Sequence, residues 1–181
     1  DAVDVPFLTG TNLNEWNLFA LMSPGGLDDS LLMERLEGIF GSGHRVHDVY
    51  ASDRPDVSAD ELWNAVLTDG SFRIPAIRLV EARGAAKSPT WQYLFTWGTP
   101  AFGGVVKSCH ALEIPFVFGV LDNQGAELFL GGPVSDDLWE LSAAMQEAWL
   151  SFARNGDPGW QAWNSESRPT QRFDVVRELL S

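Results

Sequence analysis

The chain has little cysteine, few basic residues and no long apolar run, and each shortage excludes a class of protein. The single cysteine, Cys109, rules out a disulfide within these 181 residues, makes redox chemistry unexpected and leaves the compartment open. Lys and Arg number 12 against 25 Asp and Glu, so the formal net charge of −13 would repel nucleic acid and anionic membrane surfaces. We therefore expect no nucleic acid and no membrane among its partners.

No apolar run reaches the roughly 18 residues of a membrane-spanning helix, and no charged and apolar leader opens the chain. We expect a soluble chain without a targeting segment, either cytoplasmic or secreted. It begins at Asp1 rather than Met, and we interpret this start as processed, trimmed or cut from a longer protein. With 45% hydrophobic residues it can bury a sizeable core, and no repeat or composition break indicates a second domain, so residues 1–181 are expected to belong to one domain.

Four segments show the apolar spacing of helices. The first covers residues 27–40, and the second begins at Ser58, which forms a capping-box pattern with the residue three positions on. A third helix is expected to start near Pro75, because proline suits the first turn better than a helix interior. The clearest pattern spans residues 134–155 and ends at Gly156.

Two segments predict strands: residues 3–8, which we expect to stop at Gly10, and residues 91–97, which are dense in aromatic side chains. Residues 159–174 have no clean period, and we expect an irregular segment packed on the domain surface. Two strands cannot form a sheet that is buried on both faces. The chain is therefore expected to be one part of a larger folded unit.

Histidines stand in two settings that could carry chemistry. His110 lies in "CHALEIPFVFG", among apolar residues and glycines, where a satisfied core or turn position is the alternative to a functional one. His44 and His47 could face one side of a helix, but only Asp48 accompanies them in a spacing that would suit a metal. We expect no metal site and no cofactor.

Glu15 follows the first expected strand, in "VPFLTGTNLNEWNLF", where a solvated loop charge is the alternative to a functional carboxylate. This segment resembles the one that carries the triad acid of type B carboxylesterases, the cholinesterase and para-nitrobenzyl esterase family of α/β-hydrolases. "CHALEIPFVFG" resembles the segment that carries their triad histidine. The agreement continues in the family's order through "FRIPAIRLVEARG", "WQYLFTW", "SFARNGDPGWQAW" and "RFD", and so covers essentially the whole chain.

The resemblance implies an α/β fold, namely the C-terminal portion of an α/β-hydrolase with the final strands of its sheet and the helices that pack on them. It also implies that Glu15 is the triad acid and His110 the triad base of a serine carboxylesterase, which decides both open interpretations in favour of catalysis. Glu113 either supports the site from behind or is an exposed charge on the first turn of a short helix. An apolar acyl pocket for a small-molecule ester would draw on Leu18, Phe19, Leu21 and Met22.

The sequence offers no candidate for the nucleophile. None of its serines has glycine two positions before it, so there is no G-x-S-x-G elbow, and no run of three glycines could form an oxyanion hole. Ser108 is too close to His110 along the backbone for the geometry of a serine and its base, and we interpret it as a loop residue.

We therefore expect the serine and the oxyanion hole to lie on an N-terminal part of the same esterase, either a separate chain or a missing segment. The present chain alone should then be inactive. The alternatives are a non-catalytic, cholinesterase-like adhesion module and an inactive breakdown product.

Overall fold

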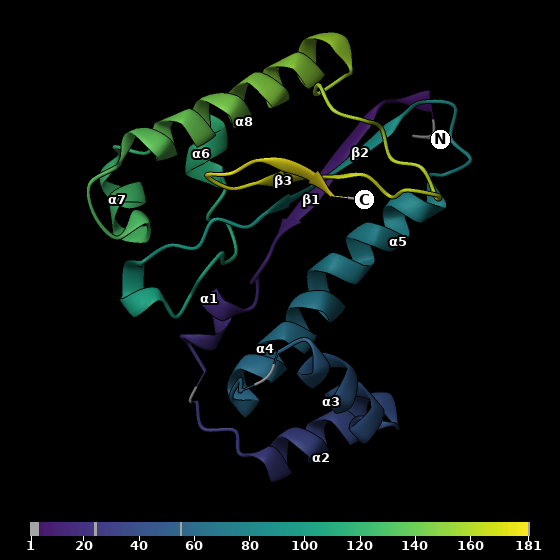
Figure 1. The fold of residues 1–181 in the computed structure, drawn as a ribbon, viewed down its shortest axis with the longest axis vertical. Coiled ribbons are helices and arrows are strands. Elements are labelled where there is room, and N and C mark those ends of the chain that lie inside the picture. Colours follow the sequence, from purple (N-terminus) through teal and green to yellow (C-terminus); the bar gives the residue numbers. More distant parts are fainter. Residues whose placement is uncertain (1–3, 24, 55, 181) are drawn as a thin grey trace.

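The computed structural model describes residues 4–23, 25–54 and 56–180, and these form a mixed sheet with helices on both faces and a separate helical layer (Figure 1). The strands are β1 (Phe7–Asn12), β2 (Thr90–Phe95), β3 (Thr170–Phe173) and β4 (Glu178–Leu180), in the order β1-β2-β3-β4. β1 and β3 each pair parallel with β2, and β4 pairs antiparallel with β3. The register sets Asn12 opposite Phe95, so β1 and β2 end at the same edge of the sheet.

The helices are α1 (Asn17–Ala20), α2 (Asp29–Phe40), α3 (Gly43–Ser52), α4 (Ala59–Thr68), α5 (Ile74–Ala82), α6 (Ile114–Phe118), α7 (Gln124–Leu130) and α8 (Asp136–Asn155). Two irregular turns matter for the site. A π turn, η2 (Asp69–Arg73), joins α4 directly to α5, and a 3-10 turn, η3 (Ala101–Gly104), precedes the loop that carries His110. No helix among the described residues is both long enough and apolar enough to cross a membrane.

The buried side chains form two cores. One lies between the sheet and helices α6 to α8, where Phe95, Phe173 and Met145 are almost fully buried. The other joins α2, α3 and α4 through Leu36 and Leu62. Figure 1 shows these three helices together, with the continuous α4–η2–α5 helix running from them to the sheet. The site described below lies where this helix meets the ends of β1 and β2.

Three of the expected helices are confirmed together with the signals that predicted them. Asp28 caps α2 by accepting a hydrogen bond from a backbone N–H of the first turn, and Ser58 forms both hydrogen bonds of the capping box of α4. α8 begins two residues later than expected and ends at Gly156, whose left-handed φ of 72° is a conformation that glycine adopts without strain.

The expected helix near Pro75 is confirmed as α5, which has that proline in its first turn, but the helix is not separate, because η2 joins it directly to α4. In the π turn the backbone N–H of Ile74 bonds to the carbonyl of Asp69, five residues back. Pro75 has no backbone N–H to donate, and in a regular α-helix its ring would clash with the carbonyl four residues earlier. The wider π turn lies just before this proline. The capping and proline rules found the start of α5 but not its continuity with α4.

The first strand lies further along the chain than expected. Val3 falls outside the described residues, and β1 runs to Asn12, with Gly10 in its middle rather than at its end. A Cβ at Gly10 would overlap the ring of Tyr93 on β2, so glycine serves close packing between neighbouring strands here and not a turn. β2 confirms the expected aromatic strand, although it ends at Phe95.

The expected irregular segment at residues 159–174 is wrong in part, because β3 lies within it, and β4 follows it. These strands have only four and three residues, too few to show a period of two. β3 is fixed by tertiary contacts instead. Phe173 packs edge-on against Trp160, with ring centroids 5.7 Å apart, and both lie over the core beneath the sheet.

Candidate active site

The loops that follow β1 and β2 bring Glu15 and His110 into contact. Nδ1 of His110 lies 2.7 Å from Oε2 of Glu15, and the backbone N–H of His110 donates to the Glu15 carbonyl oxygen at 3.3 Å. Glu15 is only 5% exposed, whereas the His110 side chain is 43% exposed. Because Nδ1 faces the carboxylate, Nε2 is the ring nitrogen left to exchange a proton with another group.

The second carboxylate oxygen of Glu15 is held as well. Oε1 accepts a hydrogen bond of 2.7 Å from the backbone N–H of Asn12, the last residue of β1. A carboxylate with both oxygens engaged has its plane fixed, and hydrogen bonds to an ionised acceptor are stronger than neutral ones. The acid is thus orientated toward the imidazole by the end of the strand itself.

Glu113 lies beside this pair rather than on the open surface. It immediately precedes α6 and is half-buried, and its Oε2 accepts a hydrogen bond of 2.6 Å from Nδ2 of Asn12. Burial raises the pKa of the Glu113 carboxyl above its usual value, and the hydrogen bond from Asn12 partly opposes that shift. Of the two interpretations of Glu113, the geometry favours a supporting place behind the site.

Two phenylalanine rings flank the imidazole of His110. The ring centroids of Phe19, near the end of α1, and of Phe72, in the π turn, each lie 5.2 Å from that of the imidazole. The two phenyl rings are stacked with each other at 6.2 Å. Their apolar faces restrict the rotation of the imidazole and keep water from that side of it.

The π turn also holds both ends of the loop that carries Glu15. Nη2 of Arg73 donates to the carbonyl oxygens of Asn12, at 3.3 Å, and Leu13, at 2.9 Å, while Nη1 donates to Asp69 at 2.8 Å. On the far side of Glu15, the backbone N–H of Trp16 donates to the hydroxyl of Thr68 at 3.0 Å. The helix α4–η2–α5 therefore clamps the acid loop before and after the carboxylate.

Apart from Glu113, the residues that support the pair were not predicted from the sequence. Asn12 follows the expected end of the first strand at Gly10, in a position suited to a turn, and Phe72 and Arg73 lie before the expected helix start near Pro75. One available signal was the position of Asn12, since a polar side chain at the carboxyl end of a parallel strand commonly faces a site. No comparable signal marks the π turn.

Other residues considered at the sequence level lie elsewhere. Ser108 is fully buried, and its hydroxyl donates to the carbonyl oxygen of Phe95 at 2.8 Å, which fits a structural loop residue. His44 is exposed on α3, and Nδ1 of His47 lies 3.4 Å from the Asp48 carboxylate. Among the described residues no group of three or more His, Cys, Asp or Glu side chains is arranged to hold a metal ion.

A small apolar cavity opens beside His110. Its volume is about 330 Å³, and apolar side chains from α1, α6 and α7 line it, among them Leu18 and Phe129. Of the acyl-pocket candidates, Leu18 lines this cavity and Phe19 contacts the imidazole. Met22 is 77% exposed and does not line it.

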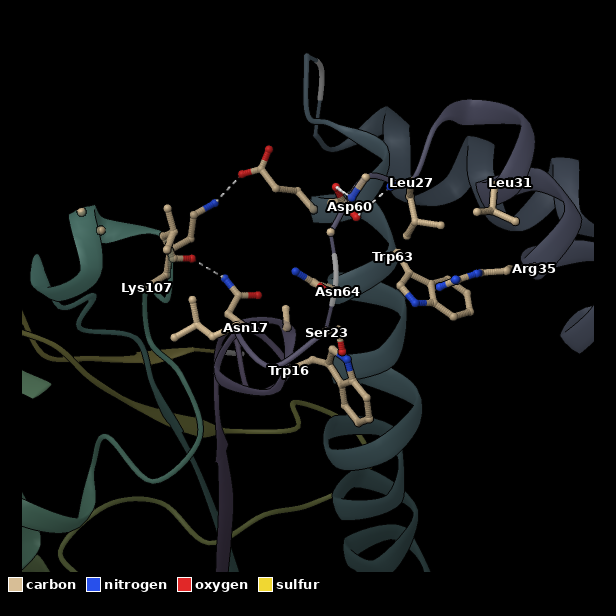
Figure 2. A pocket seen from close by; sticks show the side chains of 18 residues that line it. Trp16, Asn17, Ser23, Leu27, Leu31, Arg35, Asp60, Trp63, Asn64 and Lys107 are labelled. Atoms are coloured by element: carbon tan, nitrogen blue, oxygen red, sulfur yellow. Dashed lines mark hydrogen bonds and ion pairs between the residues drawn. The ribbon is translucent and has the colours of Figure 1, made fainter.

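A wider cleft of about 730 Å³ lies between α1, α2, α4 and the loop after η3, and neither His110 nor Glu15 lines it. Leu21, the remaining acyl-pocket candidate, faces this cleft. Two polar contacts drawn in Figure 2 lie among its lining residues: Lys107 reaches Glu61 at 3.0 Å, and Asn17 donates to the carbonyl oxygen of Val105 at 3.0 Å. The smaller cavity is therefore the one that adjoins the candidate base.

The comparisons with known proteins agree on one family. Residues 2–176 match the model of the Carboxylesterase family. The para-nitrobenzyl esterase of Bacillus subtilis is 32% identical over 180 residues, which cover 96% of this chain and 35% of the esterase. The phenmedipham hydrolase of Pseudarthrobacter oxydans is 30% identical over 93 residues, which cover 51% of this chain and 19% of the hydrolase.

Solved structures give the same answer for the fold. A carboxylesterase of Geobacillus stearothermophilus superposes with a TM-score of 0.81 at 28% identity, covering 96% of this chain and 37% of that one. A thermophilic PNB esterase superposes with a TM-score of 0.76 at 30% identity, covering 96% and 35%. The chain belongs to the carboxylesterase family, and its fold is part of an α/β-hydrolase. It spans about a third of the length of these relatives, and the expected family and fold class are confirmed.

Proposed function

We propose that this chain supplies the acid and the base of a serine carboxylesterase that hydrolyses small-molecule esters. The observation that carries the proposal is the 2.7 Å contact between a buried Glu15 and a His110 whose other ring nitrogen is free to face a substrate-binding space. Several relatives are named as ester hydrolases, including the para-nitrobenzyl esterase. The apolar cavity beside His110 suits an ester with an apolar acyl or alcohol group.

In this proposal His110 moves a proton twice. Its Nε2 accepts the proton of a serine hydroxyl as the serine oxygen attacks the ester carbonyl, and then gives the proton to the departing alcohol, which leaves an acyl-serine. Water then attacks the acyl group in the same way, releasing the carboxylic acid and restoring the serine. Glu15 accepts the Nδ1 hydrogen of His110 throughout, which fixes the tautomer and stabilises the imidazolium that forms in each step.

The serine and the oxyanion hole are proposed to lie on an N-terminal part of the same esterase, whether joined to this chain or separate from it. Two observations support this division. The sequence contains no G-x-S-x-G elbow, and the chain spans about a third of its relatives. Apolar side chains also lie exposed near the His110 loop, with Phe118 at 72% and Leu128 at 64%, as expected of surfaces that another part of the protein covers.

Steady-state hydrolysis of a short-chain para-nitrophenyl ester tests the proposal. The complete esterase, meaning this chain together with its N-terminal part, should hydrolyse the ester, and His110→Ala should lower kcat by roughly 10⁴- to 10⁶-fold. His44→Ala, on the exposed surface of α3, is the matched control and should retain the parent rate.

The 181-residue chain by itself should show only the background rate of the buffer. Turnover by that chain alone, lost on His110→Ala, would show that its nucleophile lies within these residues. An active complete esterase that is indifferent to His110→Ala would remove His110 from the reaction altogether.

A further inference from the structure

We infer that Asn12 is a positioning residue, whose side-chain amide locks the loop carrying His110 onto the end of the strand that leads to Glu15. The inference rests on the proposed esterase function, because it concerns the geometry of the same acid and base. It assigns a role to a side chain that makes no contact with the imidazole itself.

Three of the hydrogen bonds of Asn12 join the acid to the loop that carries His110. The backbone N–H of Asn12 holds Oε1 of Glu15 at 2.7 Å, while its side-chain Nδ2 donates to the carbonyl oxygen of Cys109 and to Oε2 of Glu113, both at 2.6 Å. Cys109 and Glu113 flank His110 on either side in the sequence. The side chain of Asn12 therefore binds the loop that carries His110 on both sides of the histidine, and its backbone N–H binds the carboxylate of Glu15.

Burial makes these contacts decisive for the local geometry. Asn12 is only 1% exposed, so the Cys109 carbonyl and the Glu113 carboxylate have little water to replace the amide if it is lost. The orientation of the amide is unambiguous, because both neighbours of Nδ2 are oxygens and require a donor. Oδ1 of Asn12 has no hydrogen-bond donor among the described residues. The side-chain contacts of Asn12 with the loop that carries His110 are therefore those made by Nδ2.

The contacts tie together residues 97 and 101 positions apart in the chain. β1 is followed at once by the acid, whereas the base stands at the end of a long loop after β2, with a 3-10 turn in between. Such a loop needs a fixed point near the histidine if the Nδ1 to Oε2 distance is to stay short. A displacement of about 1 Å in a catalytic group can cost about 100-fold in rate.

Asn12→Asp is the most informative substitution, because aspartate keeps the size of the side chain but cannot donate to either oxygen. In the complete esterase we expect it to lower kcat by about 10- to 100-fold and to change KM by less than about threefold, since the substrate does not touch this residue. Asn164→Asp is the matched control. Asn164 lies near the start of β2, where the neighbouring Trp163 bonds to Thr90, at the opposite end of the strand from the site.

A swapped pair separates this role from a general loss of structure. In Asn12→Asp combined with Glu113→Gln, the introduced amide can donate to the introduced carboxylate, so the bond between the two positions returns with its polarity reversed. We expect the pair to regain part of the kcat lost in Asn12→Asp, and not all of it, because the bond to the Cys109 carbonyl stays broken. Glu113→Gln alone gives the reference for that gain.

Each rate of the Asn12 and Glu113 variants is divided by the concentration of active sites, titrated with a fluorophosphonate, so that unfolded protein does not lower the measured kcat. A kcat for Asn12→Asp within twofold of the parent would overturn the inference, as would a swapped pair no more active than Asn12→Asp. His110→Ala run in parallel keeps the two claims apart. If His110→Ala abolishes activity and Asn12→Asp does not lower it, the inference fails while the proposed function stands; if His110→Ala is active, the proposed function itself fails.

Discussion

Oε2 of Glu15 lies 2.7 Å from Nδ1 of His110, although 95 positions separate the two residues in the chain. Parallel pairing of β1 with β2 accounts for the meeting, because it places the carboxyl ends of both strands at one edge of the sheet. Glu15 follows its strand after three residues, and the helix α4–η2–α5 holds the loop between them in place. The base needs additional contacts, from Asn12 and from the rings that flank the imidazole.

Glu15→Gln should leave the site folded and remove most of its activity. Glutamine keeps the shape of the side chain but cannot stabilise the imidazolium, and it can favour the wrong tautomer of His110. In the complete esterase we expect kcat for a para-nitrophenyl ester to fall by about 10⁴-fold. Glu140→Gln, at an exposed position on α8, should change it little. A Glu15→Gln variant within tenfold of the parent would show that Glu15 is not the triad acid.

Arg73→Ala should loosen the clamp on the acid loop. The substitution removes the donors to the Asn12 and Leu13 carbonyl oxygens and to Asp69. Hydrogen bonds from a charged donor contribute about 1.5–3 kcal/mol, so the free energy of unfolding should fall by about that amount, as measured by urea denaturation. Arg78→Ala, on the exposed side of the same continuous helix, is the control. Equal stability of the two variants would mean that the clamp does not contribute.

Gly10→Ala should destabilise the sheet next to the site. The added methyl group would overlap the Tyr93 ring, and overpacking of this kind costs about 1–3 kcal/mol. Gly38→Ala makes the same chemical change on α2, where nothing lies within 4 Å of the new carbon, and should stabilise the protein by about 0.5–1 kcal/mol. Urea denaturation of both variants measures the contrast, and effects of the same sign would contradict the packing argument.

Glu113→Gln should change how stability depends on pH. Burial raises the pKa of Glu113 above 4.5, so the folded state holds the proton more tightly than the unfolded state does. The free energy of unfolding contributed by this group therefore falls as pH rises from about 4.5 through the raised pKa. Glutamine removes that loss and keeps an oxygen for Asn12. The melting temperature of the variant relative to the parent should thus be higher near pH 7 than near pH 4, and the opposite trend would contradict the assigned cause.

The sequence was sufficient for the elements whose signals are local. The capping box at Ser58, the glycine after α8 and the aromatic run of β2 each predicted an element that the structure contains. The proposed acid and base, Glu15 and His110, were found through a resemblance that spans both of their segments, since neither residue is distinctive by itself. The structure then shows them in contact.

What the sequence did not predict depends on contacts between distant segments. Gly10 looked like the end of a strand because its partner, the Tyr93 ring, lies on another strand. β3 has too few residues to show the alternating pattern of a strand, and it forms because its backbone pairs with β2. Asn12 looked like an ordinary turn residue because both oxygens that it holds are about a hundred positions away.

Labelling with a fluorophosphonate, which reacts with an activated serine, tests whether His110 activates a serine that lies outside this chain. The complete esterase is labelled, digested and mapped by mass spectrometry, with His110→Ala treated in parallel. We expect one modified serine, outside residues 1–181, and loss of labelling in His110→Ala. A modified serine within residues 1–181 would contradict it, because the nucleophile would then belong to this chain.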